Sequence, residues 1–293
     1  MALIYDVLFD SQTRVLSLLD KAGNVISSCE VPSKEVLVDD PNKPLMLRAI
    51  EDNSSVTLNK NGTLSNTYQT SKDGINWTDY TFGTAISLNN EDVVYFRCSN
   101  HPTTQSNSNY VQFVMTGKVE AWHNAYSMIS SSFTNTGESV GDYGMCRLFR
   151  ACSSLTKAPL LLNALSPYCY YIMFSGCTSL TSAPQLPATT LAKSCYVSMF
   201  YGCKSLTSAP QLPATTLAES CYNSMFYFCR SLKEVRVSAT TTATDALRDW
   251  LNSVSAWGDF YCDPNATIFP TDNTSGIPKG WTRKPLSDYP VNP

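Results

Sequence analysis

The 293-residue sequence contains little charge and no long apolar segment. Asp, Glu, Lys and Arg make up 15% of it, whereas a typical soluble domain has about 25%. The formal net charge is −3, which argues against the basic face that nucleic acid requires. No run of about 18 apolar residues occurs, so we expect no membrane span. The surface is instead expected to consist of Ser, Thr, Asn and Tyr side chains.

Patterns typical of metal sites and catalytic thiols are also missing. No CxxC pair occurs, and His101 and His123 are the only two histidines, so a zinc site is not expected. His123 and Cys146 have no third residue in a recognisable orienting position, which disfavours thiol catalysis. Acidic residues occur, but not as the carboxylate pair of a glycosidase in a recognisable setting. We therefore predict no catalytic residue, no cofactor and no metal.

The segment SKDGINWTDY at residues 71–80 resembles the Asp-box hairpin of sialidases. The spacing between Asp73 and Gly74 is, however, one residue short of that motif. An Asp-Gly turn with Trp77 packed across the hairpin explains the same residues by turn chemistry alone.

The first residues lack the features of a secretory signal. Such a signal has a basic start followed by about 7–15 apolar residues, whereas Asp6 and Asp10 interrupt this stretch and no base precedes Arg14. Cys29 lies within a strand-like pattern and does not resemble a lipoprotein site. This favours assembly in a cytoplasm and release by another route, such as phage assembly followed by lysis.

One 26-residue segment of the sequence occurs twice in succession, in nearly identical form. Residues 177–202 and 203–228 differ at four positions only. A shorter, degenerate copy precedes them, and the pattern ends after Cys229. Self-similarity at a fixed period indicates a repeat architecture, so the sequence predicts a short solenoid of three linked units between Cys152 and Phe228.

Each unit combines an apolar pattern with two prolines. In SCYVSMFYGC the apolar spacing of four predicts a short helix that presents Cys195, Met199 and Cys203. The prolines of LTSAPQLP predict an extended segment. One unit buries too little apolar surface to fold alone, so the units are expected to stack. The predicted repeat core is Cys177, Leu180, Leu186, Leu191, Cys195, Met199, Phe200, Cys203, Leu206, Leu212, Leu217, Cys221, Met225, Phe226 and Cys229.

The repeat pattern CxSLTSAPxLPATTLAxxCYxxMFxGC resembles the leucine-rich repeats of the Treponema pallidum or BspA type. These repeats are common in surface proteins of gut Bacteroidetes and in their phages. The resemblance covers about residues 145–235, and SGIPKGWT at 275–282 also resembles the end of such proteins. It implies a right-handed solenoid with strands on one side and short helices on the other, and a role in adhesion without catalysis.

The flanking regions predict a mostly β fold with short helices. We expect an N-terminal β meander and anchor at 1–40, a β-sandwich-like domain at 45–120, the solenoid with its N-terminal cap at 121–235, and a C-terminal cap and tail at 236–293. Asn61-Gly62 and Asp73-Gly74 predict turns between the strands of the sandwich. A capping helix is predicted within 244–256, where Leu247, Trp250, Leu251 and Val254 have helical spacing.

The cysteines and tyrosines of the repeats leave alternatives open. The eleven cysteines are expected to be reduced and stacked in the core, although disulfides are the alternative if the protein is secreted. Recurring tyrosines are candidate ligand contacts, because a tyrosine ring stacks on sugars or proteins. Their alternative role is packing against the neighbouring coil. These residues are Tyr170, Tyr196, Tyr222, Tyr201 and Tyr227.

The favoured hypothesis is a non-catalytic virion structural protein, a head or tail fibre or decoration. Its N-terminal region would join other virion proteins or identical chains, most plausibly as a trimer. Its repeats would contact a glycan or protein of the host or mucosal surface. The alternative is a BspA-like adhesin on the bacterial cell surface.

Overall fold

The computed structural model describes residues 6–10, 15–19, 22, 25–30, 37–99, 105–130 and 139–289. The chain divides into two compact units, Met1–Val38 and Asp39–Pro293. The fold is mostly β with several sheets, as the sequence predicts. The described residues contain no α-helix, and their only helical turns are the 3-10 segments η1 (Ala125–Met128) and η2 (Leu286–Asp288).

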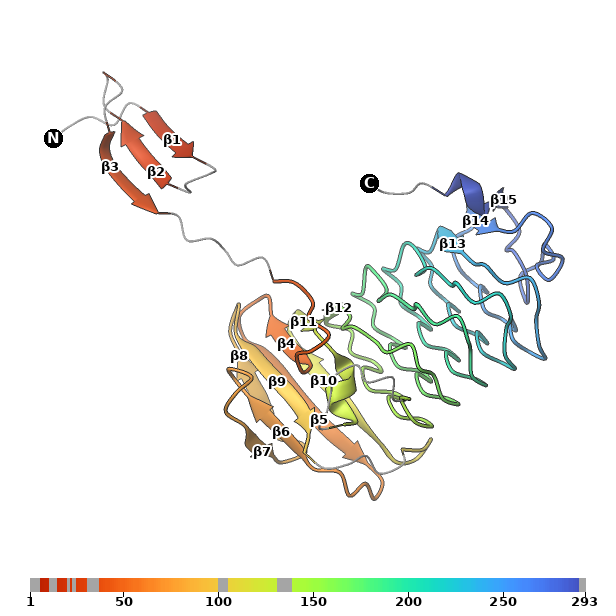
Figure 1. The fold of residues 1–293 in the computed structure, drawn as a ribbon, viewed down its shortest axis with the longest axis horizontal. Helices are drawn as coiled ribbons and strands as arrows, with labels where there is room; N and C mark the ends of the chain where they lie inside the picture. Colours follow the sequence, from red (N-terminus) through yellow and green to blue (C-terminus); the bar gives the residue numbers. More distant parts are fainter. Residues whose placement is uncertain are drawn as a thin grey trace. The chain divides into compact units, whose positions relative to one another are not determined.

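The N-terminal unit is a three-stranded antiparallel sheet (Figure 1). Its strands are β1 (Asp6–Asp10), β2 (Val15–Leu19) and β3 (Val25–Glu30), paired in that order. This is the predicted meander. Most residues of its two connecting turns lie outside the described part of the chain.

The second unit begins with two sheets packed face to face. Phe96 and Phe113 join them, with ring centroids 5.0 Å apart, and alternate residues of β9 and β10 are buried. One sheet has the order β10-β5-β8 and the other β12-β11-β4-β9-β6-β7. The strand bounds are β4 (Met46–Ala49), β5 (Ser54–Asn61), β6 (Tyr68–Ser71), β7 (Thr78–Tyr80), β8 (Ile86–Leu88), β9 (Val93–Cys98), β10 (Tyr110–Thr116), β11 (Val119–Trp122) and β12 (Leu155–Lys157).

The sandwich continues into the repeats without a break in the core. Strand β12 belongs to the first repeat and pairs in parallel with β11. The rings of Phe113 and Phe149 stack at 5.3 Å. The predicted domain ranges 45–120, 121–235 and 236–293 therefore all lie within one compact unit.

The repeats form stacked coils held by an alternating hydrogen-bond pattern (Figure 1). In residues 194–203, each odd-numbered N–H donates to the carbonyl three residues earlier. Each even-numbered N–H donates to the next coil, to the carbonyl 25 residues ahead. Because every N–H of this segment has a partner, stacking satisfies the backbone without a regular helix or a long strand.

This pattern corrects the predicted short helix at SCYVSMFYGC. Ser194, Ser198 and Gly202 have φ values of +55°, +52° and +70°, which no right-handed helix contains. The segment is a run of tight turns with one left-handed residue in every four. Apolar residues four positions apart share a face of these turns, just as they do in a helix, so the spacing alone did not separate the two structures.

The predicted capping helix within 244–256 is wrong for the same reason. Asp245, Asp249 and Ser253 have positive φ, and the carbonyls of alternate residues from Thr244 to Asn252 accept N–H groups of the preceding coil. An α-helix would use those carbonyls internally and leave the preceding coil without acceptors. Residues 244–253 are thus one more coil.

The C-terminal end consists of a parallel sheet and of the loop at residues 263–280, which we call the covering loop. Strands β13 (Glu234–Arg236), β14 (Gly258–Cys262) and β15 (Trp281–Pro285) pair in that order. The Phe269 ring stacks on Trp250 at 6.0 Å, and the Trp250 indole N–H donates to the Gly276 carbonyl at 3.1 Å. The loop therefore covers the last coil, which is the role that the sequence assigned to a helix.

Equivalent apolar side chains of successive coils form columns in the core. Phe149, Phe174, Phe200 and Phe226 stack with centroids 5.5–5.7 Å apart and planes within 6°. Every member of the predicted repeat core is buried except Leu191, which is half-buried and packs against the core.

Candidate binding surface

Three of the five candidate tyrosines lie in the core. Tyr170, Tyr196 and Tyr222 are at most 1% exposed and form a column with centroids 5.8 and 6.1 Å apart. The Tyr170 hydroxyl donates to the Leu162 carbonyl at 3.0 Å. Their prediction as ligand contacts is wrong, because all three rings are buried inside this column, which Trp250 continues by stacking on Tyr222 at 6.3 Å.

The other two candidates form a surface pair, in which Tyr201 is exposed and Tyr227 is half-buried. Tyr201 is 38% exposed and stacks on Tyr227 at 5.4 Å with planes 6° apart. Phe228 contacts Tyr201 and Tyr227 edge-on, at 5.8 and 4.5 Å. We call Tyr201, Tyr227 and Phe228 the aromatic platform. The coil geometry places it, because the Gly202 N–H donates to the Tyr227 carbonyl and so sets the two tyrosines side by side.

Two charged residues at equivalent positions of adjacent coils carry opposite signs. Lys193 and Glu219 occupy equivalent positions of adjacent coils, and their side chains form an ion pair at 2.8 Å. Had both copies kept the same charge, stacking would have placed like charges side by side. This explains one of the four differences between the two copies.

Ten cysteines of the second unit are buried, and nine of them, from Cys146 to Cys262, are free thiols. Three of the thiols donate to phenylalanine carbonyls of the preceding coil, as Cys203 does to Phe174 at 3.1 Å, and the Cys152 thiol donates to the Phe113 carbonyl of β10. Burial raises the pKa of Cys229 to about 12 and that of Cys146 to about 12. Because the thiolate is the nucleophile, these side chains are inert at neutral pH.

His123 is held by backbone groups near the start of the second unit. Its Nδ1 accepts the backbone N–H of Asp40 at 3.1 Å, and the backbone N–H of His123 donates to the Asp39 carboxylate at 2.8 Å. Burial lowers its pKa, so the imidazole is neutral at pH 7. This arrangement fixes the chain near residue 40 and leaves Nδ1 occupied.

The Asp73 hairpin is a structural turn. The Asp73 carboxylate accepts the N–H groups of Asn76 and Ile75 at 2.8 and 2.9 Å. These hydrogen bonds hold the pKa of Asp73 well below its usual range, and the bond from Asn76 has the largest effect. Gly74 has φ of +74°, as the Asp-Gly turn requires. The Arg97 guanidinium lies 4.1 Å from the centroid of Trp77.

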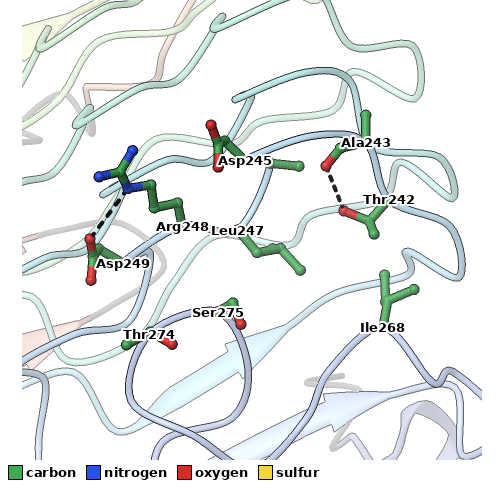
Figure 2. Close-up of a pocket in the computed structure, with 10 residues that line it drawn as sticks. Thr242, Ala243, Asp245, Leu247, Arg248, Asp249, Ile268, Thr274 and Ser275 are labelled. Carbon is green, nitrogen blue, oxygen red and sulfur yellow. Dashed lines mark hydrogen bonds and ion pairs between the residues drawn. The ribbon is translucent and has the colours of Figure 1, made fainter.

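A pocket of about 550 Å³ lies between the last coil and its covering loop. Figure 2 shows Leu247 and Ile268 extending into it from opposite sides. Asp249 is paired with Arg248 at 3.9 Å, and Figure 2 shows Asp245 apart from this pair. The two acids therefore do not converge on one point, as an acid–base pair must.

The described part of the chain holds no metal-binding group of three or more His, Cys, Asp or Glu side chains. None of its helical segments is long and apolar enough to cross a membrane. The sequence analysis did not predict this pocket or a second cleft near Arg236. Ser and Gln recur 26 residues apart at Ser182 and Ser208 and at Gln185 and Gln211, and this recurrence could have indicated the second cleft.

Comparison with known protein families, curated proteins and solved structures finds no match to this chain.

Proposed function

We propose that this protein is a non-catalytic structural protein of a phage virion, a head or tail fibre or decoration. In this proposal its coils are a BspA-type leucine-rich-repeat solenoid displayed for adhesion. The resemblance of residues 145–235 to that family motivates the identification, and the stacked coils are compatible with it.

The aromatic platform is the observation that carries the adhesive role. Stacking uses the backbone groups of the turns internally, so the outer face is made of side chains alone. Tyr201 and Tyr227 present flat rings with polar tips, which suit a sugar ring or a protein surface. The inert thiols and the bound His123 are consistent with a role that needs no chemistry.

The N-terminal unit suits an anchor. In the described residues, β1 and β3 each pair with β2 only, so each has an outer edge that can accept a strand from another chain. We propose that these edges dock on other virion proteins or on identical chains, most plausibly in a trimer.

Reduced cysteines favour the virion over the alternative, a secreted BspA-like adhesin. Free thiols persist in a cytoplasm, whereas oxidising compartments promote disulfides. Thiol titration of the unfolded protein without reductant separates the two. The virion hypothesis predicts nearly all eleven cysteines to react, and extensive disulfide formation would favour the secreted adhesin.

The adhesive role is tested with residues 39–293, which form a compact unit of their own. This fragment should bind the surface of host cells, and Tyr201→Ala with Tyr227→Ala should weaken binding roughly ten-fold or more, since each stacked aromatic contributes about 1 kcal/mol. Trp257→Ala is the matched control, because Trp257 is 61% exposed but lies outside the platform. Equal binding by all variants would refute the platform as the contact surface.

A further inference from the structure

We propose that a polar cleft on the coils binds a sugar residue that carries a carboxylate. The cleft has a volume of about 320 Å³, at the lower end of the range for small-molecule sites, about 300–1,000 Å³. Two successive coils and the C-terminal segment form it. Its polar lining residues are Ser182, Gln185, Ser208, Gln211, Arg236 and Tyr289.

The repeat itself generates the row of polar side chains. In SAPQLP the prolines hold the chain extended, so Pro184 and Leu186 are buried and Gln185 between them is exposed. The next coil places Gln211 at the equivalent position. The Leu212 N–H then donates to the Arg236 carbonyl at 3.0 Å, which brings Arg236 beside Gln211 and extends the row.

Arg236 is held in place, and its buried Nε–H has no acceptor among the described residues. Its guanidinium lies 4.5 Å from the centroid of the Tyr289 ring, and the Tyr289 hydroxyl donates to Glu234 at 2.9 Å, which fixes that ring. Within the described residues no carboxylate lies within 4.0 Å of the Arg236 guanidinium, and its Nε–H is buried without a hydrogen-bond partner. A guanidinium positioned by stacking, without an ion pair to any described residue, can bind both oxygens of a carboxylate through its two terminal amino groups.

The neighbouring groups narrow the ligand to a sugar acid. The side-chain amides of Gln185 and Gln211 both donate and accept, and so match the hydroxyls of a sugar ring, whereas a lone carboxylate would leave them unused. The Glu234 carboxylate beside Tyr289 disfavours a doubly charged phosphate more than a singly charged carboxylate. A uronic or sialic acid residue combines one carboxylate with several hydroxyls.

The test is calorimetric titration of the full chain at low ionic strength. The probes are trigalacturonic acid and sialyllactose, each compared with its own methyl ester, which removes the charge but keeps the sugar. At least one acid should bind, with its ester about ten-fold weaker or more, because a charged hydrogen-bonded contact is worth about 1.5–3 kcal/mol. Arg236→Gln should weaken the acid by a similar factor and leave the ester unchanged.

Arg248→Gln is the matched control, because it removes the same charge from a side chain that is 66% exposed and lies elsewhere. Gln185→Ala with Gln211→Ala tests the amide row without touching the core, since both glutamines are exposed, and should weaken acid and ester alike. Thermal unfolding checks that each variant folds. If Arg236→Gln does not fold, the double glutamine variant still tests the cleft.

Three results would each overturn the proposal: no binding of either acid, equal binding of acid and ester, or equal weakening by Arg236→Gln and Arg248→Gln. The cleft is distinct from the aromatic platform, so Tyr201→Ala should leave these affinities unchanged. Loss of cell attachment on changing the platform and loss of sugar-acid binding on changing Arg236 are therefore separable outcomes.

Discussion

At the scale of single residues, stacking places equivalent side chains of successive coils beside one another. Neutral side chains gain from this, as the phenylalanine and tyrosine columns do. The same charge at equivalent positions of two coils would be repulsive. One copy has Lys193 and the next has Glu219 at this position, so the two side chains attract each other instead. The same rule explains why Tyr196 and Tyr201 differ in role: one belongs to an internal column and the other to an external one.

The two tyrosines give opposite predictions. Tyr196→Ala should lower the free energy of unfolding by about 3–5 kcal/mol, since it leaves a cavity inside the column. Tyr201→Ala should change it by less than about 1 kcal/mol, because this side chain is exposed on the platform. Urea unfolding of both variants measures the difference, and a similar loss in the two would contradict the internal and external assignment.

The buried thiols predict a loss of stability at alkaline pH. Burial raises the pKa of Cys221 and Cys229 from the ordinary 9.0 to about 12. Because the folded pKa is the higher one, the neutral thiol stabilises the fold fully below pH 9, and this contribution is lost as pH rises toward 12.

Urea unfolding at a series of pH values and fixed ionic strength measures this effect. The free energy of unfolding should fall progressively above pH 9, with the buried tyrosines of the core adding to the fall because burial also raises their pKa values. A flat profile between pH 9 and 11 would contradict the burial of these groups.

At the scale of elements, the tight turns repeat every four residues and an α-helix every 3.6. Over ten residues the two periods select almost the same apolar positions. Residue type does not separate them in general: Ser194 and Ser198 occupy left-handed positions in one coil, whereas Ile172 occupies one in another.

Ser198→Gly distinguishes the two structures. In a helix interior the substitution would lower the free energy of unfolding by roughly 0.5–1 kcal/mol. At the positive φ of Ser198 glycine is unstrained, so we expect the stability to stay the same or rise by a few tenths of a kcal/mol. Val197→Gly, at a neighbouring position without positive φ, is the control and should destabilise. A loss at residue 198 as large as at 197 would favour the helix.

How much the sequence could predict follows from these elements. The mostly β composition, the three N-terminal strands and the strands of the sandwich follow from alternating patterns and turn residues, which are local signals. The buried repeat positions follow from the 26-residue period. The role of 244–253 could not be predicted locally, because it depends on acceptors required by Ser220 and Tyr222 of the preceding coil. The Arg236 cleft depends likewise on residues from three parts of the chain.

At the scale of the whole molecule, each coil leaves hydrogen-bonding groups and apolar rings for the next one to cover. The last repeat is covered by residues 244–253, and these by the loop that carries Phe269. The stack therefore has to end in a cap whose outer face tolerates water.

Removal of residues 240–293 should expose Tyr222 and Phe226, which are otherwise buried, together with the unpaired N–H groups of that coil. We expect aggregation or a sharp loss of stability, measured by light scattering and thermal unfolding. A truncated chain that remains soluble, monomeric and equally stable would mean that the C-terminal segment is not the cap.

We propose that the N-terminal unit attaches this protein to a phage particle and that the coils carry the adhesive surface. Mass spectrometry of purified virions from a Bacteroidetes culture tests it most directly, with the full chain and residues 39–293 expressed side by side during infection. The account predicts that the full chain copurifies with virions at a fixed number of copies and that residues 39–293 do not, although they still bind the host surface. Absence of the full chain from virions, or equal retention of both forms, would contradict it.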